Sequence, residues 1–186
     1  MDRYLDQWAR INRWHRKVNT FYEGERSVLE DNERLDMVRT FFIECFHLKD
    51  WIKADFPNLS VATERIFDRV EGEECFKICA DLANASKHVD LNKAVRKDKE
   101  TKIGTQGITI MVDPIKWDSD PKDYLPPVCK YRWDIIASRK KFDVKELADE
   151  CIESWKKFMR KNGLSIEIVA RLSIPIDGTS FDAKAS

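Results

Sequence analysis

A polar octapeptide, Asp81-Leu82-Ala83-Asn84-Ala85-Ser86-Lys87-His88, lies near the end of a stretch whose apolar spacing predicts a helix. Its positions 81, 84 and 88 would share one stripe of that helix. An imidazole titrates near pH 6.5, so His88 could serve as a general acid or base, while Asn84 and Lys87 could contact a phosphate. The alternative for His88 and Lys87 is an interaction with the last carbonyls and the dipole of the helix.

A second polar segment, His47-Leu48-Lys49-Asp50-Trp51, places His47 and Asp50 one turn apart on another helix. If the two stripes face each other, they form a polar cluster inside a helical bundle. Asp50 could then orient His88 or neutralise Lys87, because a buried carboxylate needs a partner. His47 could orient the catalytic histidine, or it could be a satisfied residue between helices.

The charge of the chain limits its electrostatic partners. Its 33 basic and 33 acidic residues sum to zero, so no overall field recruits nucleic acid or an anionic membrane, and any RNA contact must come from a local patch. Several basic runs could provide one, or could be ordinary solvated helix faces. These runs are the first helix (Arg3, Arg10, Arg13, Arg16, Lys17), the triplet Arg139 to Lys141, and the stretch from Lys156 to Lys161.

The cysteines predict a reducing compartment. Their number is odd, five, and each sits in an apolar pattern without a CxxC pair, which indicates buried thiols in a cytoplasmic protein. Cys75 and Cys79 are spaced like zinc ligands, but nothing nearby completes a tetrahedral set, so we expect no metal and no cofactor. The N-terminus lacks a signal-peptide core, and no apolar run approaches the roughly 18 residues of a membrane span.

Apolar periodicity predicts four helices in this chain of 186 residues. They run from Tyr4 to a stop at Gly24, from Asp31 or Asn32 to Pro57, from Ser60 to the octapeptide with a bend at Gly72, and from Asp143 to Gly163. In the last of these, Asp143 followed by Glu146 resembles a capping box.

Alternating residues predict strands between the third and the last helix. One strand contains Ile108, Ile110 and Val112, and the next contains Tyr131, Trp133 and Ile135. Residues 166–172 alternate as well, so a further strand could follow the last helix. The predicted fold is therefore α+β and mainly α, with a small antiparallel sheet inserted at about 103–138. Residues 1–174 would form a single domain and 175–186 a flexible tail.

Three features together resemble small bacterial helical proteins of the HEPN superfamily over about residues 35–160. They are a central helix with His-Leu-Lys-Asp-Trp, a next helix ending in Asp-Leu-Ala-Asn-x-x-Lys-His, and a final helix with Trp155 and Phe158. HEPN domains are four-helix bundles, commonly homodimeric, and many are metal-independent ribonucleases of toxin–antitoxin and phage-defence systems. The resemblance implies a four-helix bundle, a homodimer and RNA as partner.

The hallmark of the superfamily is an arginine, usually followed by a polar residue, and a histidine four to six residues further on. Asn84 and His88 match this pattern, but Ala83 stands where the arginine would be. By resemblance, His88 would move the proton, Asn84 and Lys87 would hold the phosphate, and Asp50 or His47 would orient the histidine. The alternative is a non-catalytic bundle that binds a partner protein, with the polar stripe fixing helix register; such a network would be buried, whereas a catalytic cluster would be exposed.

Overall fold

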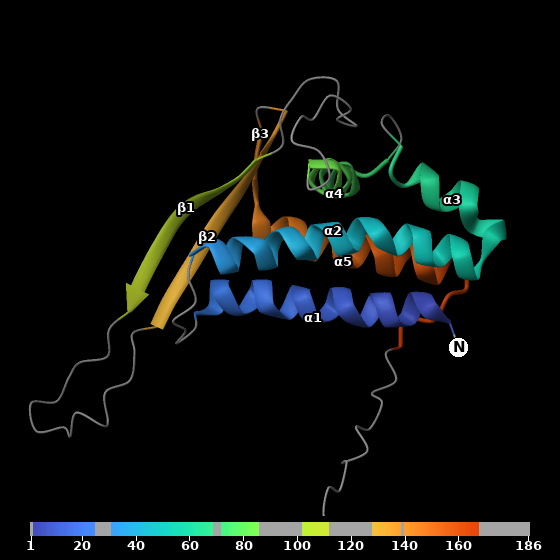
Figure 1. Ribbon diagram of the computed structural model, residues 1–186, viewed down its shortest axis with the longest axis horizontal. Helices are drawn as coiled ribbons and strands as arrows, with labels where there is room; N and C mark the ends of the chain where they lie inside the picture. Colours follow the sequence, from blue (N-terminus) through green and yellow to red (C-terminus); the bar gives the residue numbers. More distant parts are fainter. Residues whose placement is uncertain are drawn as a thin grey trace, which may run out of the picture.

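The computed structural model describes residues 2–24, 31–68, 72–85, 102–111, 128–138 and 140–167 (Figure 1). This part of the chain is mainly helical, with a small antiparallel sheet. The helices are α1 (Arg3–Glu23), α2 (Asp31–Asp55), α3 (Ser60–Arg65), α4 (Glu74–Ala85) and α5 (Val144–Lys161), with a short 3₁₀ helix at Pro57–Leu59. The strands are β1 (Lys102–Met111), β2 (Val128–Ala137) and β3 (Lys140–Asp143), so the sheet precedes the last helix as predicted.

The helices pack in layers around a shared core. Helices α1, α2 and α5 run along one another, and α4 crosses the group on the side away from α1 (Figure 1). Trp155 of α5 is fully buried, and its ring packs against Phe67, Phe76 and Phe158. Its indole Nε1 donates to the carbonyl oxygen of Cys45 on α2 at 3.2 Å. This one side chain therefore holds α2, α4 and α5 together.

The predicted ends of α1 and α5 are confirmed. Helix α1 stops before Gly24, which has a φ of 107° and donates its N–H to the carbonyl oxygen of Thr20. A positive φ costs glycine little, which explains the stop. The carboxylate of Asp143 accepts hydrogen bonds from the backbone N–H groups of Lys145 and Glu146 and so caps α5.

The predicted third helix is wrong in one respect, because it is divided into two. Helix α3 ends at Arg65, and α4 begins only at Glu74. Between them, Gly72 donates its N–H to the carbonyl oxygen of Asp68 at 2.9 Å, and it lies so close to that backbone that a Cβ atom would collide with it. Two separate helices therefore stand where one bent helix was expected, with a bend at Gly72 just before α4.

The sheet has the order β1-β2-β3, and both pairs are antiparallel. The alternation at Tyr131, Trp133 and Ile135 is confirmed, since all three side chains are buried. The third strand of the sheet is β3, which the alternation did not predict. Of the strand expected at 166–172, residues 166 and 167 are not in a strand and the rest lie outside the described residues, as do Val112 and the predicted tail.

The segment that follows α5 returns along α1. The hydroxyl of Tyr4 donates to the carbonyl oxygen of Ser165 at 3.1 Å, and the indole Nε1 of Trp8 donates to that of Ile166 at 3.2 Å. Both side chains are almost fully buried. The start of the amphipathic face of α1 is thus covered by the segment after α5, while the helix also packs on α2.

Candidate functional site

Two of the predicted site residues, His47 and Asp50, lie together on α2. The imidazole Nδ1 of His47 is 3.7 Å from the carboxylate Oδ2 of Asp50, and the side chains are 32% and 51% exposed. Lys53, one turn further on, places its Nζ 3.4 Å from the other carboxylate oxygen. The pair therefore forms on an accessible helix face and is not sealed inside the core.

Helix α3 supplies a carboxylate to the lysines of α2. Glu64 lies 2.5 Å from the Nζ of Lys53 and 3.6 Å from that of Lys49. The hydrogen bond from Lys53 lowers the pKa of Glu64, and the same bond raises the pKa of Lys53. The ammonium of Lys49 also lies 4.1 Å from the ring centroid of Phe46, and the lysine side chain is only 14% exposed. Lys49 is thus engaged by Glu64 and by aromatic rings and is not open to a phosphate.

The polar octapeptide divides between the core and the surface. Asp81 and Ala83 are buried, with 1% and 0% exposure, whereas Asn84 is half-buried on α4. Lys87 and His88 lie outside the described residues. Within the described residues, the structure brings His47 and Asp50 together, and neither is joined to Asn84 by a hydrogen bond.

The burial of Ala83 bears on the missing arginine. On α4 the buried stripe includes Phe76, Cys79 and Ala83, spaced by three and four residues. An arginine at position 83 would direct its guanidinium into this stripe, where an unpaired charge is costly. A small apolar residue at position 83 therefore fits the packing of α4, and an arginine there would not.

Trp51 and Trp155, whose indole rings could stack on a base or pack in the core, differ in exposure. Trp155 is fully buried in the core, where its ring packs against Phe76 and its indole Nε1 donates to Cys45 of α2. Trp51 is 36% exposed on α2. Of these two, only Trp51 is accessible to a base.

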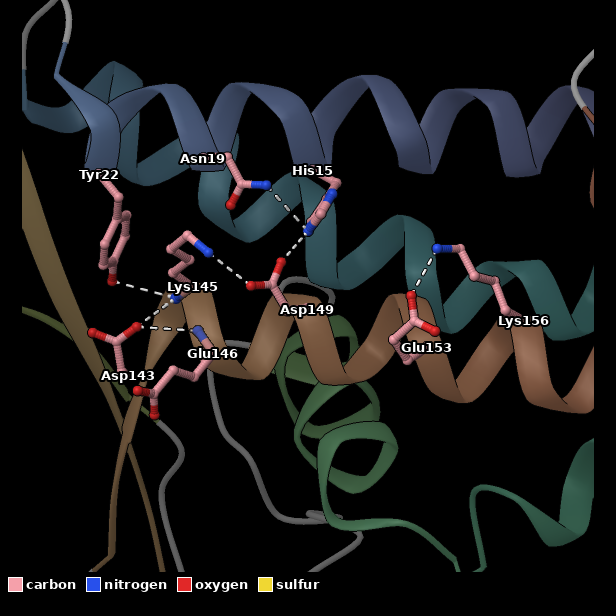
Figure 2. Close-up of polar contacts among 9 residues, drawn as sticks. All are labelled: His15, Asn19, Tyr22, Asp143, Lys145, Glu146, Asp149, Glu153 and Lys156. Carbon is pink, nitrogen blue, oxygen red and sulfur yellow. Dashed lines mark hydrogen bonds and ion pairs between the residues drawn. The ribbon is translucent and has the colours of Figure 1, made fainter.

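A polar network between α1 and α5 was missed by the sequence analysis. The imidazole Nε2 of His15 lies 2.6 Å from Oδ1 of Asp149, and the Nζ of Lys145 donates to Oδ2 of the same carboxylate at 2.8 Å (Figure 2). Burial alone would raise the pKa of Asp149, but the hydrogen bonds from Lys145 and His15 outweigh it and lower that pKa. The signal in the sequence was a histidine within the apolar stripe of α1, a position that demands a polar partner.

Tyr22 extends this network to the sheet. Its hydroxyl donates to the carbonyl oxygen of Trp133 at 3.1 Å and accepts from the backbone N–H of Trp133 at 3.2 Å. It also accepts from the backbone N–H of Lys145 at 3.3 Å (Figure 2). Burial raises the pKa of Tyr22 to about 12. The hydroxyl therefore stays protonated at neutral pH and joins α1, β2 and the first turn of α5.

The thiols lie between α2, α4 and α5. Cys45, Cys75, Cys79 and Cys151 are buried and free, as predicted, and the side chain of Cys129 lies outside the described residues. The Sγ atoms of Cys79 and Cys151 are 3.5 Å apart, and burial raises the pKa of both thiols well above its usual value. A buried thiol with a raised pKa is a poor nucleophile, so Cys79 and Cys151 are best explained as packing residues.

In the described parts of the chain, no three His, Cys, Asp or Glu side chains are grouped so that they could hold a metal ion. The described helices include none with the length and apolar character needed to cross a bilayer. The imidazole–carboxylate pairs within the described residues are thus His47 with Asp50 on α2 and His15 with Asp149 between α1 and α5. Comparisons of this chain with protein-family models, with curated proteins and with solved structures gave no match.

Proposed function

We propose that the chain is an RNA-directed helical protein of the HEPN type, acting as a metal-independent ribonuclease in a cytoplasmic toxin or phage-defence system of bacteria. The order and packing of the helices support this function. Helices α1, α2, α4 and α5 pack around one core, with α1, α2 and α5 side by side and α4 across them, and the four-helix HEPN bundle is part of this proposal. The His-Leu-Lys-Asp-Trp segment lies on α2, the Asp-Leu-Ala-Asn segment ends α4, and Trp155 with Phe158 lies on α5.

The observation that carries the function is the exposure of the His47–Asp50 pair. A network that only fixed helix register would be buried and fully paired, whereas these side chains are 32% and 51% exposed. An imidazole and a carboxylate 3.7 Å apart on an accessible face are side chains of the kinds that take up and return protons in general acid–base catalysis. In the proposed site, His47 or Asp50 orients His88, which transfers the proton, and Asn84 and Lys87 hold the scissile phosphate.

Position 83 faces the core, so we assign the positive charge of the proposed site to Lys87. Its ammonium is a point charge without the planar fork of arginine. We propose further that two copies of the chain associate as a homodimer, which sets two such sites side by side.

The test is cleavage of labelled total RNA and tRNA by the purified protein in the presence of a chelator. Wild type is compared with His88→Ala, Lys87→Ala and His47→Ala, and with Lys157→Ala, an exposed lysine of α5, as the matched control. We expect cleavage by wild type and Lys157→Ala, and its loss in the first two variants. Full activity of His88→Ala would refute the assignment of the acid or base.

The same burial of Ala83 favours a second function, a non-catalytic bundle that binds a partner protein. The ribonucleases of the superfamily use an arginine at this position to bind the scissile phosphate, and this chain has none there. Absence of cleavage by wild type that is shown to be folded would support the binding function. Capture of partners by the immobilised protein, compared between wild type and His47→Ala, would then be the next measurement.

A further inference from the structure

A cavity of about 420 Å³ opens along α1 and differs in character from the pair on α2. It is lined by Arg10, Arg13, Trp14 and Lys17 of α1 and by Glu44 of α2. Its volume falls within the roughly 300–1,000 Å³ that is usual for small-molecule sites. Its walls combine three cations, one indole ring and one carboxylate, which are the groups that bind phosphates and bases.

The one carboxylate of this cavity is already held in place. The side-chain amide of Gln7 donates to Oε2 of Glu44 at 2.5 Å and to its carbonyl oxygen at 3.0 Å. Arg10 places its Nη1 3.6 Å from the same Oε2 and balances the negative charge. The cations Arg13 and Lys17 are then in excess within the cavity, so its net charge is positive.

Arg13 and Lys17 are placed to meet an anion. Both side chains are exposed, and neither forms an ion pair with a carboxylate of the described residues. Residues four apart on a helix are neighbours on one face, so the two cations lie on the same edge of the cavity. Glu44 would repel a phosphate at the far edge, and it therefore directs a phosphate toward Arg13 and Lys17.

Trp14 gives the cavity a rigid aromatic wall. The ring is partly buried against the core, and the ammonium of Lys17 lies 4.7 Å from its centroid. That contact shows that one face of the indole can be reached from the cavity. A base can displace the flexible lysine from this face, since stacking on an aromatic ring is favourable for any base, and the lysine can then pair with the phosphate.

We infer that this cavity binds one nucleotide unit of single-stranded RNA, with its base stacked on Trp14 and its phosphate held by Arg13 and Lys17. Glu44, fixed by Gln7 and Arg10, sets the orientation of the nucleotide. RNA as the ligand rests on the proposed function, whereas the pairing of a phosphate and a base with these side chains follows from the cavity itself. The site would hold RNA away from the proposed point of cleavage and add affinity without sequence preference.

Binding is measured by fluorescence anisotropy with a labelled ten-nucleotide single-stranded RNA, on full-length protein that carries His88→Ala, with chelator present. In this background we compare Arg13→Ala/Lys17→Ala with Arg16→Ala, which removes an exposed cation of α1 outside the cavity. The double variant should raise Kd at least tenfold and reduce the slope of log K against log salt by about 0.7, the value for one phosphate contact on a single strand. Arg16→Ala should change Kd less than about twofold.

Trp14 is tested by Trp14→Leu beside Trp14→Phe, with thermal melting to establish that each is folded. Loss of the ring should weaken binding at least about fivefold, and phenylalanine should restore most of it. Equal losses of RNA affinity in Arg16→Ala and in Arg13→Ala/Lys17→Ala would show a diffuse electrostatic attraction and overturn the site. Absence of RNA binding by the His88→Ala parent would overturn it as well. If wild type cleaves RNA but the cavity variants bind RNA normally, this inference is refuted and the ribonuclease proposal stands. If RNA binding depends on the cavity but wild type cleaves no RNA, the ribonuclease proposal is refuted and this inference stands.

Discussion

His15 of α1 and Asp149 of α5 meet with 2.6 Å between the imidazole Nε2 and the carboxylate Oδ1, across 134 residues of sequence. Replacing Asp149 by Asn removes the charge that holds both His15 and Lys145. Because the carboxylate is 42% exposed, we expect a loss of about 0.5–1.5 kcal/mol in the free energy of unfolding at pH 7, less than a buried charged hydrogen bond gives. Urea denaturation measures it.

Glu153→Gln is the matched control for that substitution. Glu153 also lies on α5 and pairs with Lys156 at 2.7 Å, but the pair is within one helix and the glutamate is 66% exposed (Figure 2). Such pairs contribute about 0.3–0.5 kcal/mol. A loss in Asp149→Asn no larger than that in Glu153→Gln would contradict the role of the carboxylate in joining α1 to α5.

The lowered pKa of Asp149 should make the free energy of unfolding of the wild type fall at acid pH. Although burial raises this pKa, the hydrogen bonds from Lys145 and His15 lower it below the usual 3.8. A group whose pKa is depressed on folding contributes its stabilisation above the unfolded value, and that contribution is lost as the pH falls through the folded value. Below about pH 4, the stability of wild type should therefore fall more steeply than that of Asp149→Asn, in urea titrations from pH 7 to pH 3.

Tyr22→Phe should destabilise the junction of α1, β2 and α5. The hydroxyl satisfies the N–H and the carbonyl of Trp133 and the N–H of Lys145, and leaving such groups unpaired costs about 1–3 kcal/mol. Burial raises the pKa of Tyr22 to about 12, so its stabilisation is complete below pH 10 and is lost as the pH approaches 12. Denaturation at pH 7 and pH 11 tests both effects, with Tyr4→Phe, which loses one hydrogen bond to Ser165, as the smaller control.

Ala83→Arg would restore the arginine of the HEPN pattern. Because Ala83 is fully buried, we expect this variant to lose more than about 3 kcal/mol of stability, from overpacking and from a buried charge without a partner. Asn84→Arg, one position along on the half-buried side of α4, should cost under about 1 kcal/mol. A stable Ala83→Arg protein with ribonuclease activity would show that α4 presents another face to the core.

Truncation of the two tryptophans should reduce the free energy of unfolding by different amounts. Trp155→Phe removes a buried indole and its hydrogen bond to Cys45, and we expect a loss of about 1–3 kcal/mol. Trp51→Phe, at a residue with 36% exposure, should cost under about 0.5 kcal/mol. Thermal or urea unfolding distinguishes them, and equal effects would contradict the packing of α5 against α2.

Local signals in the sequence predicted local features well. The ends at Gly24 and Asp143, the amphipathic face of α1 and the alternation in β2 each depend on residues within a few positions of one another. The contact of His47 with Asp50 was also predictable, because a spacing of three residues on a helix makes neighbours.

Non-local features were not predictable in this way. Two features closer in sequence were missed as well, because neither the apolar spacing nor the alternation signals them: the break between α3 and α4, and strand β3, which pairs with β2. The partner of His15 lies on a helix that begins more than 120 residues later. A single sequence shows that such a histidine needs a partner but not which residue supplies it.

The hydrogen bonds from Tyr4 to Ser165 and from Trp8 to Ile166 span 161 and 158 residues. During synthesis, the start of the first helix must therefore wait for almost all of the described chain before these two hydrogen bonds form, whereas much of its buried face packs on α2, the next helix in the chain. The rings of Tyr4 and Trp8 stay incompletely covered until then, and they are a target for chaperones. Closing so long a loop carries an entropic cost, so the docking of the segment after α5 onto α1 is expected to be a late step of folding.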